Sequence, residues 1–403
     1  MANIGINITK NGTTTLATAG KYCDRNIDVN VDVAGAGGGG IPEEGLIITG
    51  NCKYKFCFNN WNWFIEAYKD KIITKDIELA HSMFYYSNSL TEIPFDLNFK
   101  GNSEKPSCFY SCYQLQKVGN LDFNYGGGPL NSFFYGCYEL KEIGTIKNIG
   151  TPEKQYNTPM SNFFRYCKKL RQLPNIENVY LANNSYLDNI FGDCYSLRSI
   201  PQQWMDIFSR VNHTSQTDSL YKGLCCYNYC IDEILNIPVD YYDDSHGFVS
   251  NAFTNAFKEC YHLKNLTFAT NEDGSAKIAR WKNQTIDLSS YIGYANNAGY
   301  IYNYNSGLTV WGNITNSESY NTLKDNPDSW TMDINYSRYN HDSAVATINS
   351  LPDTSAYLSA NGGTNTIKFN GAAGALTDGG AINTLTEAEI AVAAAKGWTI
   401  SLV

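Results

Sequence analysis

Charged residues are scarce in this sequence of 403 residues, and the chain lacks the excess of Lys and Arg that is typical of nucleic-acid-binding proteins. Only 17% of the residues are charged, and the formal net charge is −9. Surfaces that bind nucleic acid need clustered Lys and Arg to meet the phosphates. We therefore expect a mildly acidic chain that binds no nucleic acid.

Long apolar runs are also missing. No stretch approaches the roughly 20 apolar residues that a membrane-spanning helix requires. The first ten residues, MANIGINITK, lack the basic start and apolar run of a secretory signal. We expect no membrane insertion, and assembly in a cytoplasm rather than export by the usual route.

Metal-binding and catalytic patterns are absent as well. The five His residues are scattered, and the twelve Cys residues do not form the paired C-x-x-C spacing of a zinc site. The acidic pairs Asp243-Asp244 and Glu43-Glu44 are adjacent in sequence and need not converge on a substrate. The sequence predicts no metal, no cofactor and no enzymatic activity.

What the sequence does contain is a repeat, F-x-x-C-x-x-L-x-x-I. Its copies begin at Phe84, Phe109, Phe134, Phe164, Phe191, Cys225 and Phe257. The first four intervals are 25, 25, 30 and 27 residues, mostly within the range of leucine-rich repeats. Ser87 and Asn228 stand where the other copies have Cys. Because no single repeat can bury its own apolar row, we predict a stacked solenoid.

The repeat also explains the cysteines. Five of them occupy one fixed position of successive copies: Cys112, Cys137, Cys167, Cys194 and Cys260. A thiol at an interior position of a stack behaves as a small buried hydrophobe. We therefore predict core cysteines rather than disulfides or catalytic nucleophiles. The Phe is expected on a short helix or turn, pointing inward, with Leu and Ile entering a short strand.

The segments before the repeats differ in character. Residues 1–34 alternate polar and apolar positions, which predicts short strands with one buried face: Ile4, Ile6, Ile8, Ile27, Val29, Val31 and Val33. Residues 35–41 are Gly-rich and read as a hinge. Residues 42–80 contain an aromatic cluster that we expect to cap the solenoid: Phe56, Phe58, Trp61, Trp63 and Phe64.

After the repeats of residues 81–270, residues 271–403 are predicted to continue as C-terminal repeats and a cap. Alternating pairs indicate strands at Met332 and Ile334, at Ile367 and Phe369, and at Ile400 and Leu402. Thr386-Glu387-Ala388-Glu389 has the form of a capping box. The Ala-rich helix that follows should run to Lys396 and end at Gly397.

These residues carry a family resemblance. The phrase FYGCYELKEI at 134–143 and its siblings resemble the BspA-like leucine-rich repeats of surface and adhesion proteins. The ending LTEAEIAVAAAKGWTI resembles the closing repeat of such proteins. The start, ITKNGTTTLATAGKYCDRNIDVNV at 8–31, resembles short N-terminal modules of tail and fibre proteins from phages of gut bacteria. The resemblance implies an α/β repeat solenoid of leucine-rich repeats with a short N-terminal β module.

An outward face of the repeats is the candidate binding surface. It comprises positions between the motif Leu and Ile together with the residue after the motif Cys: Tyr113, Gln116, Lys117, Tyr138, Lys141, Glu142, Lys168, Arg171, Gln172, Tyr195, Arg198, Tyr261 and Lys264. The Tyr members predict a surface ladder interrupted by Lys168. Two interpretations stay open: a solvated face with Tyr stacked for stability, or an aromatic face that binds a macromolecule.

Two functions are in competition. The first is a bacteriophage virion protein, a tail or head fibre or appendage, whose residues 1–34 dock to other virion proteins. Its solenoid would face a bacterial surface glycan or protein. Resemblance implies a homo-oligomer, with a trimer favoured, although no heptad predicts a coiled coil. The alternative is a bacterial cell-surface leucine-rich-repeat adhesin, which requires a secretion signal or wall anchor.

Overall fold

The computed structural model describes part of the chain. The described residues are 4–10, 13–19, 31–32, 46–58, 62–102, 104–182, 185–208, 211, 221–238, 255–257, 260, 262–263, 265–268, 285–287, 309–310, 331–333, 341–351, 353–369 and 385–402. The chain divides into two compact units, residues 1–182 and residues 183–403. Each unit is described by itself.

The N-terminal residues of unit 1 form a small sheet of their own. Strand β1 (Ile4–Lys10) pairs antiparallel with β2 (Thr13–Ala19) and parallel with β3 (Val31–Asp32), where Ile8 lies opposite Val31. The predicted short strands are thus confirmed at Ile4, Ile6, Ile8 and Val31. The other predicted positions, Ile27, Val29 and Val33, lie outside the described residues, as does the glycine segment 35–41.

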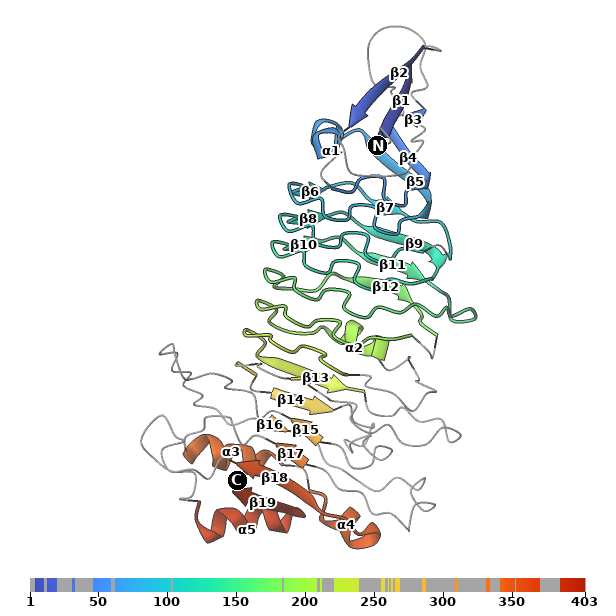
Figure 1. Ribbon diagram of the computed structural model, residues 1–403. Coiled ribbons are helices and arrows are strands. Elements are labelled where there is room, and N and C mark those ends of the chain that lie inside the picture. Colours follow the sequence, from blue (N-terminus) through green and yellow to red (C-terminus); the bar gives the residue numbers. More distant parts are fainter. Residues whose placement is uncertain are drawn as a thin grey trace. The chain divides into compact units, whose positions relative to one another are not determined.

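Unit 1 continues as a parallel β-solenoid, in which each turn contributes to two sheets. The first sheet contains the motif Ile or Val and consists of two-residue strands: β6 (Glu92–Ile93), β8 (Lys117–Val118) and β10 (Glu142–Ile143). Their registers are in step, since Ile93, Val118 and Ile143 are partners across the sheet. The predicted stack of short strands is confirmed (Figure 1).

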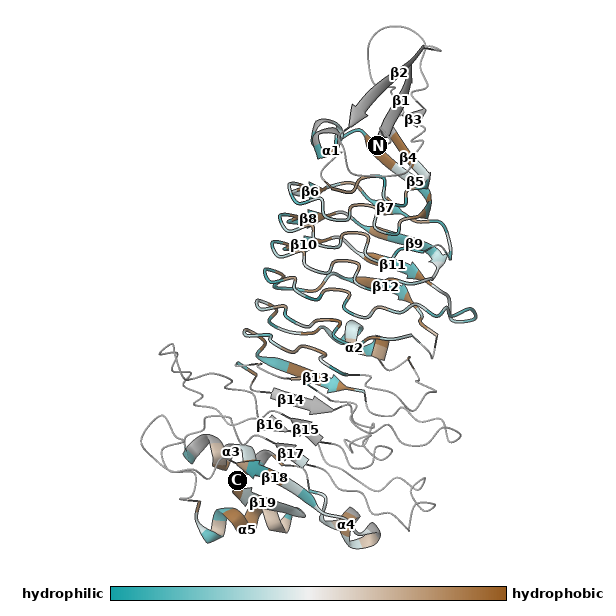
Figure 2. Cartoon of the chain, viewed as in Figure 1, coloured by the Kyte–Doolittle hydropathy of each residue, from teal (hydrophilic) through white to brown (hydrophobic). Residues whose placement is uncertain are grey.

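The second sheet begins a few residues after the motif, and the four-position pattern did not predict it. Its strands are β7 (Leu97–Asn98), β9 (Leu121–Gly126), β11 (Ile146–Ile149) and β12 (Ile176–Val179). In Figure 2 these strands combine brown and teal residues, because one side of each faces the core. Gly119 and Gly144 lie at the corner between the sheets, where an added Cβ of Gly119 would come 2.4 Å from the Phe95 carbonyl oxygen.

The motif Phe side chains form a continuous column in the core. Phe84 and Phe109 stack with ring centroids 4.8 Å apart, Phe109 and Phe134 at 5.2 Å, and Phe134 and Phe164 at 5.6 Å. All four are fully buried. The backbone repeats the same period, because the Phe84 N–H donates to the Cys108 carbonyl and the Phe109 N–H to the Phe133 carbonyl. Stacked rings and backbone hydrogen bonds therefore hold each turn to the next.

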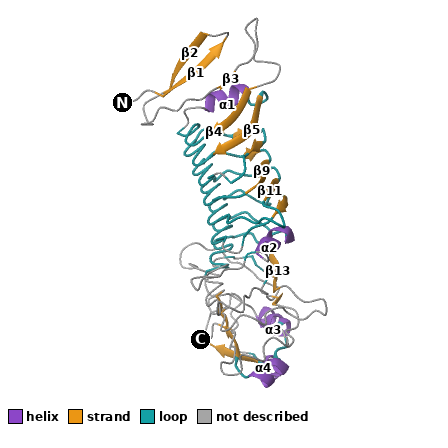
Figure 3. Cartoon of the chain, turned by 90° about the vertical axis from the view of Figure 1, so that its right-hand side faces the viewer, coloured by secondary structure: helices purple, strands orange, loops and turns teal. Residues whose placement is uncertain are grey.

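Left-handed residues flank each motif Phe and keep the turn from becoming a helix. Around Phe109 they are Ser107 (φ 56°) and Ser111 (φ 57°), and around Phe134 they are Ser132 (φ 55°) and Gly136 (φ 76°). A right-handed helix cannot pass through such residues. The motif Phe consequently lies in a turn, and the only helix described in unit 1 has seven residues (Figure 3). The solenoid is as predicted, but the α/β composition is not: this is a parallel β-solenoid with little helix.

The motif Cys residues are free and buried, as predicted, and they also serve as hydrogen-bond donors. The Cys112 thiol donates to the Phe84 carbonyl (3.0 Å), Cys137 to the Phe109 carbonyl (3.1 Å) and Cys167 to the Phe134 carbonyl (3.3 Å). Ser87 replaces Cys and keeps this bond, with its hydroxyl 2.6 Å from the Phe56 carbonyl. The position therefore selects a small side chain that can donate a hydrogen bond.

The expected cap is itself a turn of the solenoid. Strand β4 (Leu46–Asn51) pairs parallel with β5 (Ile72–Leu79), and helix α1 (Asn62–Tyr68) lies between them in sequence. Phe56 takes the motif position and stacks on Phe84 at 5.3 Å. Phe58 is exposed. Trp61 lies outside the described residues, and the side chains of Trp63 and Phe64 are not described.

Unit 2 repeats the arrangement with more helix. Helix α2 (Gln202–Phe208) precedes a parallel sheet of β13 (Glu233–Ile237), β14 (Asn265–Phe268) and β16 (Thr309–Val310). The hydrogen bonds from Phe191 N to Leu224 O and from Cys225 N to Ala256 O confirm the predicted register of the degenerate copy. Asn228 is fully buried, and among the described residues its side-chain amide has no hydrogen-bond partner.

A second parallel sheet of unit 2 ends the chain. It consists of β15 (Thr285–Asp287), β17 (Thr331–Asp333), β18 (Asn365–Phe369) and β19 (Trp398–Leu402). Helices α3 (His341–Ser350), α4 (Ser355–Asn361) and α5 (Glu387–Ala395) alternate with the last strands, which confirms the predicted helix-strand units.

The end of the chain agrees with the sequence. The capping box of Thr386 and Glu389 is formed, and Gly397 follows α5 with φ 82°. Ile367 and Phe369 are buried. The strand predicted at Ile400 and Leu402 is confirmed as β19. Within it Trp398 is the buried residue, and Leu402 is 46% exposed.

We predict that the motif thiol can be replaced by a hydroxyl but not by a methyl group. Cys137→Ala removes the donor to the Phe109 carbonyl and leaves a void, so it should destabilise the protein by about 1–3 kcal/mol. Cys137→Ser should cost less, as the serine at position 87 already fills this role. Urea unfolding midpoints of the two variants test this order, and equal midpoints would contradict a donor role.

A second prediction concerns the degenerate copy. Asn228→Cys should stabilise the protein by about 1–2 kcal/mol, because it removes a buried amide without partners and restores the motif donor. The change in thermal unfolding temperature of the full chain measures it. A variant less stable than the parent would show that Asn228 fits its site better than a thiol does.

Candidate binding surface

Two columns of tyrosine run along the turns of unit 1. The first, one residue after each motif Phe, was not predicted. Tyr85 stacks on Tyr110 with ring centroids 5.1 Å apart, and Tyr110 stacks on Tyr135 at 4.7 Å with rings within 6° of parallel. All three side chains are partly exposed. The sequence signal was the Tyr at this position in three successive copies.

The second column is the predicted ladder. Tyr113 and Tyr138 stack at 4.9 Å, which confirms the ladder at these two positions. Lys168 continues it with its ammonium 4.4 Å from the centre of the Tyr138 ring, a cation–π contact. In unit 2, Tyr195 stacks on Tyr229 at 4.6 Å. Tyr261 lies outside the described residues.

Stacking determines which parts of these rings are accessible. Both faces of Tyr110 are covered by Tyr85 and Tyr135, and both faces of Tyr138 are covered by Tyr113 and Lys168. Burial raises the pKa of Tyr85, Tyr110 and Tyr138, and neighbouring tyrosines raise it further. Neutral phenols with covered faces present ring edges and hydroxyl groups. They suit hydrogen bonding better than stacking by sugars or bases.

The predicted polar positions lie beside these columns and are exposed. The structure places Gln116, Lys117, Lys141 and Glu142 in neighbouring turns, where Lys117 pairs with Glu142 (3.1 Å) and Lys141 donates to Gln116 (3.1 Å). Arg171 and Gln172 are exposed in the next turn, and Arg198 is exposed in unit 2. Lys264 lies outside the described residues. In the described part of unit 1, the two tyrosine columns together with these polar residues are here called the tyrosine face.

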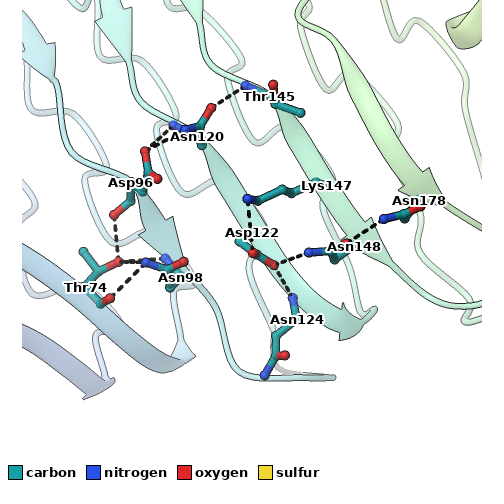
Figure 4. A network of polar contacts seen from close by, with 10 residues as sticks. All are labelled: Thr74, Asp96, Asn98, Asn120, Asp122, Asn124, Thr145, Lys147, Asn148 and Asn178. Carbon is teal, nitrogen blue, oxygen red and sulfur yellow. Dashed lines mark hydrogen bonds and ion pairs between the residues drawn. The ribbon is translucent and has the colours of Figure 1, made fainter.

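A polar network on the second sheet was missed by the sequence reading (Figure 4). Asn120 accepts from the Thr145 N–H at 2.8 Å and donates to Asp96 at 3.0 Å. Farther along, Asn148 donates to Asp122 (3.0 Å) and Asn178 donates to Asn148 (3.0 Å). These groups satisfy one another between turns, so they explain stability rather than recognition. The sequence signal for this network was a polar residue that recurs in each strand of the second sheet.

Left-handed Asn residues shape this network. Asn148 has φ 61° and Asn178 has φ 53°, and Asn tolerates this region better than most residues. At Asn148 the pairing of β11 with β9 shifts register, as in a β-bulge. Both side chains donate to the preceding strand of the sheet, Asn148 to Asp122 of β9 and Asn178 to Asn148 of β11.

One lysine is buried, which the sequence reading also missed. The Lys105 ammonium donates to the carbonyls of Gly101 (3.0 Å) and Gly127 (3.1 Å) and lies 5.7 Å and 5.6 Å from the ring centres of Phe99 and Phe123. Burial lowers its pKa to about 8. These contacts hold neighbouring turns together, so among the described residues Lys105 is part of the core.

The described residues contain no cluster of metal ligands, and most of their cysteines are buried. Within them, no three His, Cys, Asp or Glu residues gather as metal ligands. The Cys137 and Cys225 thiols are buried, and burial raises their pKa well above the usual range, which disfavours the reactive thiolate. No helix in the described ranges is both long and apolar enough to cross a membrane.

Comparison with protein-family models, curated proteins and solved structures found no match to this chain. The structure therefore assigns the fold on its own geometry, as a parallel β-solenoid.

Stability should fall on the alkaline side of neutrality. Burial raises the pKa of Cys52 to about 11 and also raises that of Cys137 well above its usual range. Because the folded pKa exceeds the unfolded value of about 8.5, the stability is complete below pH 8.5 and is lost as pH rises toward 11. Lys105 has the opposite effect, since its lowered pKa of about 8 makes the stability rise with pH above that value. It is one group against several buried thiols, so we expect the fall in stability to dominate.

Urea unfolding at a series of pH values tests this balance. The midpoint should fall steadily above a pH of about 8.5, and more steeply in Lys105→Met, which removes the opposing group. A midpoint that stays level or rises to pH 10 would contradict burial of the thiols, since ionisation would then cost the folded state nothing.

Proposed function

We propose that this chain is a structural protein of a bacteriophage particle, a tail or head fibre or appendage. In this proposal residues 1–34 dock to other virion proteins, and the solenoid presents the tyrosine face to a bacterial surface glycan or protein. The proposal includes the finer assignment of the repeats to the BspA-like leucine-rich class. It also includes a homo-oligomer, with a trimer favoured, assembled in the host cytoplasm.

The observation that carries the binding role is the tyrosine face. Its two stacked columns hold their side chains in fixed positions, so little conformational entropy remains to be lost when a partner binds. Rigid, amphipathic Tyr side chains with exposed polar neighbours are typical of recognition surfaces. A repeat stack also offers the same groups at regular intervals, which suits an elongated partner.

Two features support the docking role. The strands β1, β2 and β3 form their own sheet, and within the described residues none of them pairs with a solenoid strand. The sequence resemblance of residues 8–31 to phage tail and fibre modules supports the setting. A self-contained sheet at one end of the chain is the kind of element that binds a particle while a second element faces outward.

Deletion of residues 1–40 tests the docking role. The truncated protein should keep the circular dichroism spectrum and unfolding midpoint of the solenoid but should be absent from purified particles. A matched control keeps residues 1–40 and carries Lys71→Gln and Lys75→Gln, two exposed changes on or beside β5, and should be incorporated normally.

Two outcomes would overturn the proposal. One is continued incorporation of the truncated protein into particles. The other is localisation of the full chain, by immunogold labelling, to the bacterial envelope in cells without phage, which would support the adhesin alternative.

A further inference from the structure

We infer that the turn after Phe164 forms a binding site for an acidic polysaccharide, through four cations held at the end of the tyrosine columns. The inference rests on the proposed function and names the partner of its recognition surface. The four residues are Arg165, Lys168, Lys169 and Arg171, here called the basic turn.

The basic turn stands out from the charge pattern of the chain. Its four cations lie within seven residues that contain no acid, in a protein whose net charge is −9. The preceding turn instead mixes signs, with Glu139, Lys141 and Glu142. Glu142 is already paired with Lys117. Among the described residues Lys169 makes no ion pair with Glu139 or any other acid, and Arg171 makes none either.

Two of the cations are held in place by the tyrosines. The Lys168 ammonium lies 4.4 Å from the centre of the Tyr138 ring, and the Arg165 guanidinium lies 5.1 Å from that of Tyr166. Arg165 also donates to the Asn162 side-chain oxygen at 3.3 Å. These contacts fix the positions of the two cations beside the tyrosine rings. Lys169 and Arg171 are exposed beside them.

The columns continue this site along the preceding turns. The Lys169 N–H donates to the Tyr138 carbonyl, so the basic turn lies directly against the turn of Tyr135 and Tyr138. The phenol groups of these rings can donate hydrogen bonds to hydroxyl and anionic oxygens. A row of phenol hydroxyl groups that leads to four cations fits an elongated polymer that bears both hydroxyl groups and anionic oxygens.

The same geometry disfavours the other polyanions. Single-stranded nucleic acid is held by bases stacking on open aromatic faces, and the faces of Tyr110 and Tyr138 are covered. A peptide partner is usually anchored by apolar side chains in a desolvated centre. In the described part of unit 1 the exposed apolar residues lie away from the basic turn, at Ile47, Phe58 and Ile73. An acidic polysaccharide requires neither open aromatic faces nor apolar anchor sites.

Binding of defined polymers to the full chain tests the inference. The probes are polygalacturonate, which supplies carboxylates, and phosphomannan, which supplies phosphates, with neutral dextran as the uncharged control. We expect saturable binding of at least one acidic probe, weakened by salt, and none of dextran. The probe that binds more tightly identifies the anionic group that the basic turn prefers.

Variants locate the binding on the surface. Lys169→Gln combined with Arg171→Gln should weaken binding about tenfold and reduce its salt dependence. Lys71→Gln combined with Lys75→Gln removes the same charge elsewhere and should bind as the parent does. Tyr113→Phe combined with Tyr138→Phe keeps the stacked rings but removes two hydroxyl groups, and should weaken binding several-fold at an unchanged unfolding midpoint.

Three results would overturn the inference. They are no binding of either acidic probe at low salt, equal weakening by the two charge variants, and binding of single-stranded DNA or poly-glutamate as tight as that of the acidic polysaccharide. These results are distinguishable from failure of the particle role. The Lys169 and Arg171 variant should still enter particles, whereas the deletion of residues 1–40 tests incorporation alone.

Discussion

The alignment of one phenylalanine with the next is the constraint on which the solenoid depends. Each motif ring stacks on the ring of the following turn, and each motif amide donates to the carbonyl just before the next Phe. A turn that slipped by one residue would lose both contacts at once. The register is therefore fixed in the core. Tyr85, Tyr110 and Tyr135 each follow a motif Phe, so the alignment of the phenylalanines also aligns these tyrosines.

The cysteines have a share in this register. In unit 1 the thiols of Cys112, Cys137 and Cys167 each donate to the carbonyl of the Phe one turn earlier, so the turn that supplies a ring also receives a hydrogen bond from its neighbour. Thiols are weak donors, yet they fill a small apolar site at little cost of desolvation. Ser87 at the same position supports this explanation. Cysteine suits this position because it is small and its thiol donates a hydrogen bond, while burial lowers its reactivity.

The sequence was sufficient for what is periodic and apolar. The motif located the Phe column, the buried Cys and the first sheet, and it assigned the degenerate copy at Cys225 and Asn228 to its correct register. The capping box at Thr386 was equally clear, because its local chemistry needs no knowledge of the fold. The parts that escaped prediction depend on the stack. The second sheet begins with a two-residue strand at Leu97–Asn98, too short for a period to be visible. Its longer strands β9, β11 and β12 contain left-handed residues that interrupt the alternation, namely Asn124, Asn148 and Asn178.

Other features were hidden for related reasons. Lys105 reads as a surface residue, and only the carbonyls of Gly101 and Gly127 explain how its ammonium can be buried. At the motif Phe the sequence left a short helix and a turn both open, because single sequences do not reveal left-handed residues such as Ser107 and Ser111. In the last strand, alternation located the strand but did not show that Trp398 would be its buried residue. The tyrosine face was only half visible, since the column of Tyr85, Tyr110 and Tyr135 lies outside the motif positions.

Native-state hydrogen exchange tests the central claim most directly. If the stacked column fixes the register, the amides of Phe84, Phe109 and Phe134 should exchange slowly and with similar protection, because each is hydrogen-bonded to the next turn beneath a buried ring. The neighbouring amides of Gln114 and Glu139, which donate no backbone hydrogen bond to the described residues, should exchange much faster. Rapid exchange at the three Phe amides would contradict the account, because the turns would then not be held together by this ladder.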